Sequence, residues 1–512
     1  MLSARSRLSA MMFLQYFVWG SWAVSAGGYM GKTLHFDGQS IGLIYSTTAI
    51  GAIFAPLFIG YVADRFFATE RILATLHLIG GGLLLWAAGQ TDVQPLFITM
   101  VAYALCYMPT LALTNSISFA NIGDPEKEFP RIRVFGTLGW IVAGLIVGIA
   151  LGGVENTFFK MAGGASILLG LFCLTLPHTP PRGASGGDAL GLGAVGLFKE
   201  PSFTVFAICS FLICIPLAFY YSFANDFLVE TDRPAPTALQ TLGQISEVFF
   251  MTAMPFFILR LGVKNMLLVG MLAWIVRYLC FSTLDFSLVL VGLVLHGVCY
   301  DFFFVASQIY VDKKAPRHLR ASAQSLIAFI TLGLGMFVGS NVSGWIVKKY
   351  PAISVSVTTS TGQELPAAPL PHWADTQSGD TAWRYLDLST TVRGLLFNEK
   401  PAVSTHGPDF AATNDANGDG VLQLVEIPDS WVERPDVNDS SRDLTYSGTA
   451  LREAFAKIDR ESAGVVTRAQ WRAAQAHDWR IIWIWPSLMA GITSLLFWVG
   501  FHDRVPVTDD AR

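Results

Sequence analysis

The sequence predicts an all-α membrane protein with twelve transmembrane helices in two six-helix halves and an extracytoplasmic helical insert before the last helix. Composition supports this first: 52% of the 512 residues are hydrophobic and 14% are charged, against about 25% charged in ordinary soluble domains. A series of apolar runs, each of the roughly 20 residues that a bilayer demands, supports it second. The third observation is a polar stretch, residues 349–478, that interrupts the series near its end.

The apolar runs follow one another along most of the chain. The first, from about Ser9 to Gly31, comes after the basic residues Arg5 and Arg7. It is too long for the core of a signal peptide and lacks a convincing cleavage site, so we expect it to remain as the first helix. The other runs lie near residues 41–63, 72–90, 95–121, 133–153, 158–176, 203–228, 238–260, 265–284, 286–311, 320–348 and 479–502.

Charged residues in the short loops predict the orientation of the helices. Lys and Arg gather in alternate loops, as is typical of cytoplasmic loops, and the other loops carry mainly acidic residues. Both termini fall on the basic side, so we expect them to be cytoplasmic. The basic residues are Arg65, Arg71, Lys127, Arg131, Arg260, Lys264, Lys313, Lys314, Arg317 and Arg320, and the acidic residues are Asp37, Asp92, Glu155, Glu230 and Asp232.

A connector rich in Pro and Gly divides the helices six and six, because its composition is that of a flexible linker. Two six-helix halves are the layout of a transporter whose site lies between repeats. The predicted domains are an N-terminal half (1–176), a cytoplasmic linker (177–202), helices seven to eleven (203–348), the insert (349–478), and the last helix with a cytoplasmic tail (479–512).

An amide and a carboxylate lie inside the apolar run of helix eight. Gln244 and Glu247 are three residues apart, so a helix places them on one face. An ionised Glu near a bilayer centre costs about 2.5–3.5 kcal/mol on insertion scales, and such residues usually line a polar cavity or proton path. We therefore interpret the segment as part of a solute site. The alternative is a Glu247 that a neighbouring helix satisfies for packing alone.

Two further charges lie deep in the C-terminal half, Asp301 on helix ten and Arg277 on helix nine. Coupling to protons needs a group whose protonation differs between states, and Glu247 and Asp301 are the two candidates. Asp301 and Arg277 can instead form a structural ion pair. Such a pair leaves Glu247 as the proton carrier, so we rank Glu247 first.

Other classes of function find little support. The net charge of −4 gives no reason to expect nucleic-acid binding, and the six cysteines lie in apolar runs without zinc spacing. The chain has no P-loop, no nucleophile elbow and no metal-hydrolase cluster, so we expect neither an enzyme nor ATP-driven transport, and no cofactor for transport. We expect a monomer whose surroundings are the lipid bilayer.

Several stretches carry a resemblance to known families. The loop Gly60–Arg65, with Arg71 beyond it, resembles the signature loop of the major facilitator superfamily. Four further stretches resemble the bacterial nucleoside–proton symporter family: Phe13–Trp22; Phe129–Thr137; Gln244–Glu247 with Pro255–Phe257; and Tyr300–Phe303 with Arg320–Gln324. The similarity spans residues 9–348 and resumes at the last helix. It implies a major facilitator fold that takes up nucleosides with protons by alternating access across the cytoplasmic (inner) membrane of a bacterium.

The resemblance also implies site residues. Arg133 and Thr137 on helix five, with Gln244 and Glu247 on helix eight, match positions of polar substrate contacts. Aromatic contacts are expected at Trp140 and Tyr300, and His296 lies where the family usually has a tyrosine. An alternative interpretation of Arg133 is a positively charged residue at the cytoplasmic start of helix five.

Helix seven departs from the family pattern. The family has a glutamine and an asparagine where this chain has Ala218 and Tyr221. Because amides that read a base edge are replaced by an apolar residue and a phenol, a carrier of another polar solute such as a sugar is the alternative. Aromatic faces such as those of Trp140, Tyr221 and Tyr300 suit a flat base, but a sugar needs nearly the same set of side chains.

The insert contains a twelve-residue segment, Asp415–Glu426, that satisfies the EF-hand calcium pattern. The ligands expected from the pattern are Asp415, Asn417, Asp419, the backbone carbonyl of Val421, and Glu426, with a glycine at the sixth position for the tight turn. The sequence therefore predicts calcium as a cofactor of the insert.

A degraded second copy, Asp459–Gln470, follows 44 residues later, with Ala463 and Gln470 in place of two ligands. The two segments resemble an EF-hand pair with one competent and one degenerate loop. Extracellular modules of this kind bind calcium at about 10⁻⁴–10⁻³ M, so we prefer a structural role. A regulatory role, or a calcium-responsive receptor built on a transporter scaffold, stays open as an alternative.

Overall fold

The computed structural model describes residues 3–58, 67–153, 155–180, 192–231, 233–316, 319–360, 362, 364–371, 414, 421–433, 443–459, 464–467, 470–471 and 474–502. The chain divides into two compact units. Unit 1 comprises residues 1–229, 235–348 and 480–512, and unit 2 comprises residues 230–234 and 349–479. The loop Gly60–Arg65 of the predicted signature lies outside the described residues.

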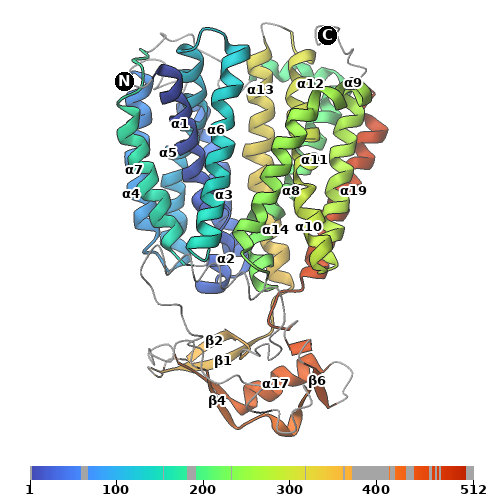
Figure 1. Ribbon diagram of the computed structural model, residues 1–512. Coiled ribbons are helices and arrows are strands. Elements are labelled where there is room, and N and C mark those ends of the chain that lie inside the picture. The colour runs from blue at the N-terminus through green and yellow to red at the C-terminus, as the bar shows by residue number, and fades with distance from the viewer. Residues whose placement is uncertain are drawn as a thin grey trace. The chain divides into compact units, whose positions relative to one another are not determined.

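Unit 1 is built from helices. Figure 1 shows those up to α7 gathered on the left of the unit and those from α8 onward on the right. The first group is α1 (Ala4–Ala23), α2 (Ala26–Gly28), η1 (Tyr29–Thr33), α3 (Gly38–Phe58), α4 (Thr69–Ala87), α5 (Val93–Ala120), α6 (Pro125–Leu145), η3 (Ile146–Ala150) and α7 (Thr157–Cys173). This grouping agrees with a division of the helices into two halves.

The second group begins with η4 (Leu192–Lys199) inside the predicted linker. It continues with α8 (Pro201–Glu230), α9 (Pro236–Ser282), α10 (Phe286–Val294), α11 (His296–Tyr300), η5 (Asp301–Val305), α12 (Ala306–Lys314), α13 (Arg320–Ala328), η7 (Phe329–Gly335), α14 (Met336–Lys349) and α19 (Trp479–Gly500). Gly262 interrupts α9 with φ 69° and ψ 166°, a backbone conformation that only glycine adopts readily. The predicted helices eight and nine are therefore the two arms of α9.

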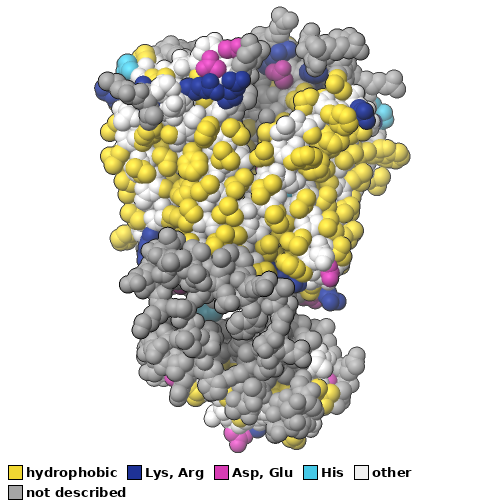
Figure 2. Space-filling model, viewed as in Figure 1, with side chains coloured by type: hydrophobic (Ala, Val, Ile, Leu, Met, Phe, Trp, Pro, Cys, Tyr) yellow, Lys and Arg dark blue, Asp and Glu magenta, His cyan; other side chains and the backbone are white. Residues whose placement is uncertain are grey.

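The surface of unit 1 is apolar over the middle of the helices. Figure 2 shows hydrophobic side chains across this band and charged side chains at its upper edge. Large apolar side chains are well exposed there, for example Phe249 at 64% and Ile492 at 62%, as a lipid-facing surface requires. Among the described residues, seven helices are long and apolar enough to cross a membrane. Helices lie over all of the predicted runs, and the number twelve stays a prediction.

The two halves approach closely at one end of the helices. A Cβ atom on Gly148 of η3 would lie 2.5 Å from the backbone nitrogen of Ala238 on α9, so the small residue permits the contact. Ser25 and Thr237 are joined by a hydrogen bond of 2.9 Å at the same end. Lys348 at the end of α14 forms an ion pair of 2.8 Å with Asp37. The described structure is therefore closed at this end.

Unit 2 contains β-strands, so the prediction of an all-helical insert is wrong. It holds β1 (Ser354–Thr359), β2 (Glu364–Pro369), β3 (Val421–Gln423), η8 (Leu424–Glu426), β4 (Ser430–Glu433), β5 (Leu444–Ser447), α17 (Gly448–Ile458) and β6 (Val465–Thr467). The strands form one sheet of order β2-β1-β5-β4 and a second ribbon of β3 with β6. In β1, Val355 and Val357 alternate with exposed serines, a period-two pattern that favours a strand. The core of the unit includes Leu422, Tyr446, Phe455, Val466 and Trp471.

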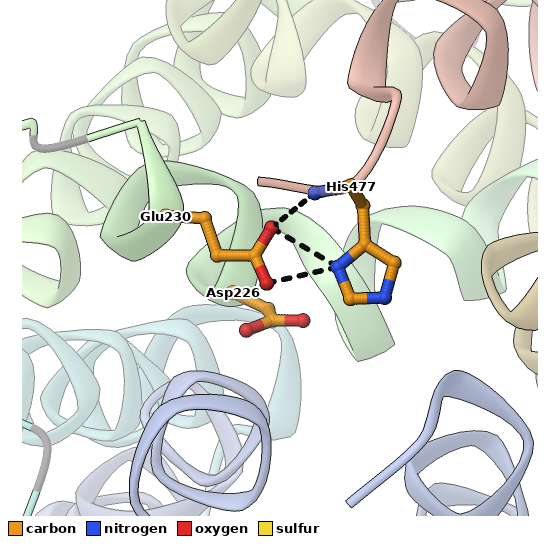
Figure 3. A group of neighbouring side chains, drawn as sticks. All are labelled: Asp226, Glu230 and His477. Carbon is orange, nitrogen blue, oxygen red and sulfur yellow. Dashed lines mark hydrogen bonds and ion pairs between the residues drawn. The ribbon is translucent and has the colours of Figure 1, made fainter. Parts of the chain in front are cut away.

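Glu230 and His477 bring the ends of unit 2 together. Figure 3 shows the Glu230 carboxylate directed at the His477 ring, 2.8 Å from Nδ1. The same carboxylate accepts hydrogen bonds from the backbone nitrogen of His477 and the indole nitrogen of Trp479. One acid thus fixes the chain just before α19 begins.

Candidate solute and proton site

The site is centred on the first arm of α9. Gln244 is 8% exposed, and Glu247, one turn later, has a side chain that is 18% exposed. Helical spacing places both on one face, as predicted. A carboxylate that keeps partial access inside an apolar helix is suited to receive a proton or a solute.

His296 at the start of α11 lies opposite Glu247. Its ring is fully buried, and its Nε2 atom is 3.9 Å from Oε2 of Glu247. Gly243 makes room for the ring, because a Cβ atom there would lie 3.0 to 3.3 Å from His296 atoms. Gly297 similarly allows α11 to contact the backbone at Ser246. Two glycines therefore set the distance between the histidine and the carboxylate.

Arg277, on the second arm of α9, pairs with this histidine. Its Nη1 atom is 3.0 Å from Nδ1 of His296. Its guanidinium lies over the ring of Tyr220, 3.6 Å from the centroid, a cation–π contact. Within the described residues Arg277 forms no ion pair with Asp301, so the alternative of a structural pair between them is not seen.

Tyrosines surround His296. The rings of Tyr220 and Tyr300 lie 5.1 and 5.7 Å from the imidazole at angles of about 30°, and Tyr221 meets it edge-on at 6.3 Å. Tyr221 is the predicted contact on α8. Ala218 instead packs against Gly339 of α14, where a Cβ atom would lie 2.7 Å away. A close contact between helices therefore accounts for a small residue at position 218.

The N-terminal half contributes a cation and aromatic rings from α1 and α6. The Arg133 guanidinium lies 4.1 Å from the centroid of the Tyr16 ring. Trp140, two turns further along α6, meets Trp19 at 5.4 Å with an angle of 73°. Thr137 lies between them on α6 and is half-buried. The predicted residues Arg133, Thr137 and Trp140 therefore follow one face of α6.

Charges from the two halves interact across the site. Glu247 on α9 interacts electrostatically with Arg133 on α6. Tyr300 also interacts electrostatically with Glu247, Arg133 and Tyr16. The structure thus brings predicted residues of both halves together around a carboxylate and a guanidinium, which can hold a solute that carries donors and acceptors.

Asp301 follows Tyr300 in the chain. It is fully buried at the start of the π-helical segment η5, and such segments are frequent at functional sites. The charges of Asp301 and Glu247 interact, and no described cation forms an ion pair with Asp301. Two interacting carboxylates disfavour simultaneous ionisation, so protonation of one favours the charged form of the other.

Sequence reasoning missed several contributors. Tyr16 and Trp19 lie one turn apart on α1, and they contact Arg133 and Trp140 of α6. Two aromatic residues at this helical spacing were the signal that the sequence offered. A buried network also ties α1 to its neighbours: Gln15 binds Thr110 at 2.7 Å and His77 at 2.8 Å. No sequence pattern reveals these partners, because they lie on three different helices.

The predicted calcium ligands are described only in part. Asp415, Asn417 and Asp419 lie outside the described residues. Val421 begins β3, and Glu426 ends η8 and accepts a hydrogen bond of 2.7 Å from the backbone nitrogen of Gln423.

These features define a helical membrane transporter, and comparisons with known proteins name its family. The sequence model described as "Nucleoside H+ symporter" matches residues 2–361, and the chain belongs to this family. A putative nucleoside transporter, YegT, of Escherichia coli (strain K12) is 43% identical over 364 residues, which cover 68% of this chain and 85% of that protein. The protein is therefore a transporter rather than an enzyme.

Two further relatives agree. A xanthosine permease of Escherichia coli (strain K12) is 37% identical over 369 residues, covering 68% of this chain and 88% of the permease. A crystal structure of the nucleoside transporter NupG matches with a TM-score of 0.64 at 31% identity, covering 78% of this chain and 98% of that one. The similarity of fold thus extends over nearly the whole of that transporter.

Proposed function

We propose that the protein takes up nucleosides together with protons across the cytoplasmic (inner) membrane of a bacterium by alternating access. The observation that carries the proposal is the partly exposed Glu247 carboxylate of α9, which lies 3.9 Å from Nε2 of His296 and whose charge interacts with that of Arg133 in the other half. Membership of a family of nucleoside H⁺ symporters supports both the solute class and the coupling ion. We expect a monomer with both termini in the cytoplasm.

The proposed proton carrier is Glu247, with Asp301 as its neighbour. Glu247 retains access whereas Asp301 is fully buried, so a proton reaches Glu247 more readily. Protonation of Glu247 relieves the repulsion between the two carboxylates. Solute and proton then bind at the same place, which couples their movement.

Uptake into proteoliposomes tests the proposal. Radiolabelled uridine, adenosine or xanthosine should accumulate when an inward proton gradient is imposed. Glu247→Gln should abolish accumulation but retain exchange of solute, because the amide keeps hydrogen bonding and cannot carry a proton. Unchanged accumulation by Glu247→Gln would remove this residue from the coupling step.

A sugar carrier is the competing function. Tyr221 in place of an amide favours it, because a phenol does not read a base edge as an amide does. The same vesicles should therefore be offered disaccharides. Sugar accumulation without nucleoside accumulation, by folded protein, would overturn the nucleoside proposal.

We further propose that unit 2 binds calcium through Asp415–Glu426, with Asp459–Gln470 as its degenerate partner. The pairing of β3 with β6 supports this: Leu422 lies opposite Val466, and each is the eighth residue of its twelve-residue segment. Such pairing is expected of two EF-hand loops, because a short strand at the centre of one loop is not stable without a partner strand.

Hydrogen bonds at equivalent positions give further support. In the second segment the sixth residue, Gly464, has φ 74° and donates to Asp459 at the first position. The twelfth residues behave alike: Glu426 accepts from the backbone of Gln423, and Gln470 accepts from that of Thr467.

Calorimetry on the purified full chain tests calcium binding. We expect one calcium site with a dissociation constant on the order of 10⁻⁴–10⁻³ M. Asp415→Ala should abolish binding, and Asp459→Ala, the matched change in the second segment, should leave it intact. Equal losses from both changes, or no heat from the native chain, would contradict the proposed division between the segments.

A further inference from the structure

Arg277 is a buried cation whose described neighbours are mainly aromatic. It is fully buried, its guanidinium lies over Tyr220, and Trp274 and Phe281 follow at 5.5 Å each. Among the described residues no carboxylate forms an ion pair with it. A buried charge without a counter-ion is costly to keep. The hydrogen bond between Arg277 and His296 must therefore be considered in detail, because it is a polar contact of this cation.

The chemistry of that contact fixes the proton on the histidine. An arginine side chain has only donors, so Nδ1 of His296, 3.0 Å from Nη1, must present a lone pair. The neutral ring then carries its proton on Nε2. A second proton cannot enter on Nδ1 without facing the guanidinium hydrogen.

The Nε2 atom faces the site. It is buried, has no hydrogen-bond partner within the described part of the chain, and lies 3.9 Å from the Glu247 carboxylate. Tyr220 and Tyr221 from α8 and Tyr300 from α11 hold the ring in place. The charged groups around His296 are thus Arg277 and Glu247, both from α9.

We propose that Arg277 is a positioning residue that holds His296 as the neutral Nε2–H tautomer, a fixed hydrogen-bond donor to an oxygen of the solute. This inference rests on the proposed transport function and specifies how a polar solute is recognised there. The acceptor is a carbonyl or hydroxyl oxygen of the nucleoside that enters beside Glu247. His296 therefore does not carry the transported proton, which binds to the Glu247 carboxylate.

Nitrogen NMR on the full-length protein tests the tautomer directly and requires no transport. The protein is labelled with ¹⁵N-histidine, and the His296 signals are assigned by their loss in His296→Gln. Between pH 5 and 8 we expect Nε2 protonated and Nδ1 unprotonated. A protonated Nδ1 in the native chain would overturn the proposal even if nucleoside transport is confirmed.

Transport by matched variants supplies the second test. In Arg277→Met the histidine is released, so KM should rise about tenfold for the lost alignment of one hydrogen bond. A new inflection should also appear in the pH profile near the ordinary histidine value of about 6.5. Arg277→Lys, which keeps a donor, should restore the native profile in part.

The double variant Arg277→Met with His296→Gln is the control for the inflection. It lacks the titrating ring, so the new inflection should vanish from the pH profile of whatever exchange of solute it retains. If Arg277→Met shows the native KM and pH profile, Arg277 has only a structural role. If native transport fails for every nucleoside, the proposed function is wrong, but the NMR result still decides the tautomer.

Discussion

Two arginines, one in each half, lie over tyrosine rings, and they differ in burial. Arg133 lies over Tyr16 at 4.1 Å and is half-buried. Arg277 lies over Tyr220 at 3.6 Å and is fully buried. An arginine stacked on a tyrosine ring therefore occurs twice, once with partial solvent exposure and once fully buried.

Access separates what the two cations can do. The Arg133 guanidinium can meet a solute, and it interacts with the charge of Glu247 on the opposite half. Arg277 is fully buried among aromatic rings and donates to His296, so it does not meet the solute itself. A cation–π contact alone therefore does not indicate a solute-binding residue, because the exposure of the arginine decides whether its charge can contact the solute.

The largest effect expected from this comparison is at Arg133. Arg133→Leu should lower kcat/KM for nucleoside uptake about a hundredfold, because hydrogen bonds to charged groups contribute about 1.5–3 kcal/mol. Arg131→Leu is the matched control, since Arg131 is exposed on the same helix. Uptake rates at several substrate concentrations give the answer. Equal losses in both variants would mean that Arg133 serves only as a positive charge at the predicted cytoplasmic end of α6.

A smaller effect is expected at Gly243, whose lack of a side chain leaves room for the His296 ring. Gly243→Ala places a methyl group about 3.0 Å from the His296 Cβ atom, so the ring must shift by a few tenths of an ångström. We expect KM for nucleoside uptake to rise severalfold, because only the hydrogen bond from His296 is misaligned and the contacts of Arg133 are kept. Gly82→Ala is the control, because nothing lies within 4 Å of its Cβ position. A normal KM in Gly243→Ala would show that the histidine tolerates displacement.

The smallest effect concerns the ion pair of Asp37 with Lys348, whose side chains are accessible to water. Burial alone raises the pKa of Asp37, but hydrogen bonds from Lys348 and Ser40 lower that pKa overall. Its contribution to stability is therefore present above the usual value of 3.8 and is lost as the pH falls through the lowered pKa.

Thermal unfolding in detergent tests this contribution. Because both side chains are about half exposed, Asp37→Asn should cost at most about 1 kcal/mol at pH 7. The difference from the native protein should disappear in strong acid. A difference that grows on acidification would contradict the sign of the lowered pKa.

Local sequence patterns predicted much of the helical unit and part of the candidate site. Gln244 and Glu247 share a face because helix geometry depends only on spacing. Arg133, Thr137 and Trp140, which the family resemblance implied, follow one face of α6 for the same reason. Apolar runs predicted where helices lie, since a bilayer imposes their length. The same reasoning did not predict the sheets of unit 2, in which β1 pairs with β5 and β3 pairs with β6 over long separations in sequence.

The sequence by itself determined that this is a helical membrane protein, where its helical runs lie and which carboxylates fall within them, because these follow from composition and from spacing within one helix. Only the tertiary structure decided the partner of Arg277, which is His296 rather than Asp301. It also decided that Ala218 packs against Gly339. Both outcomes depend on how separate helices are placed, and a buried charge takes whichever acceptor that placement brings within about 3 Å.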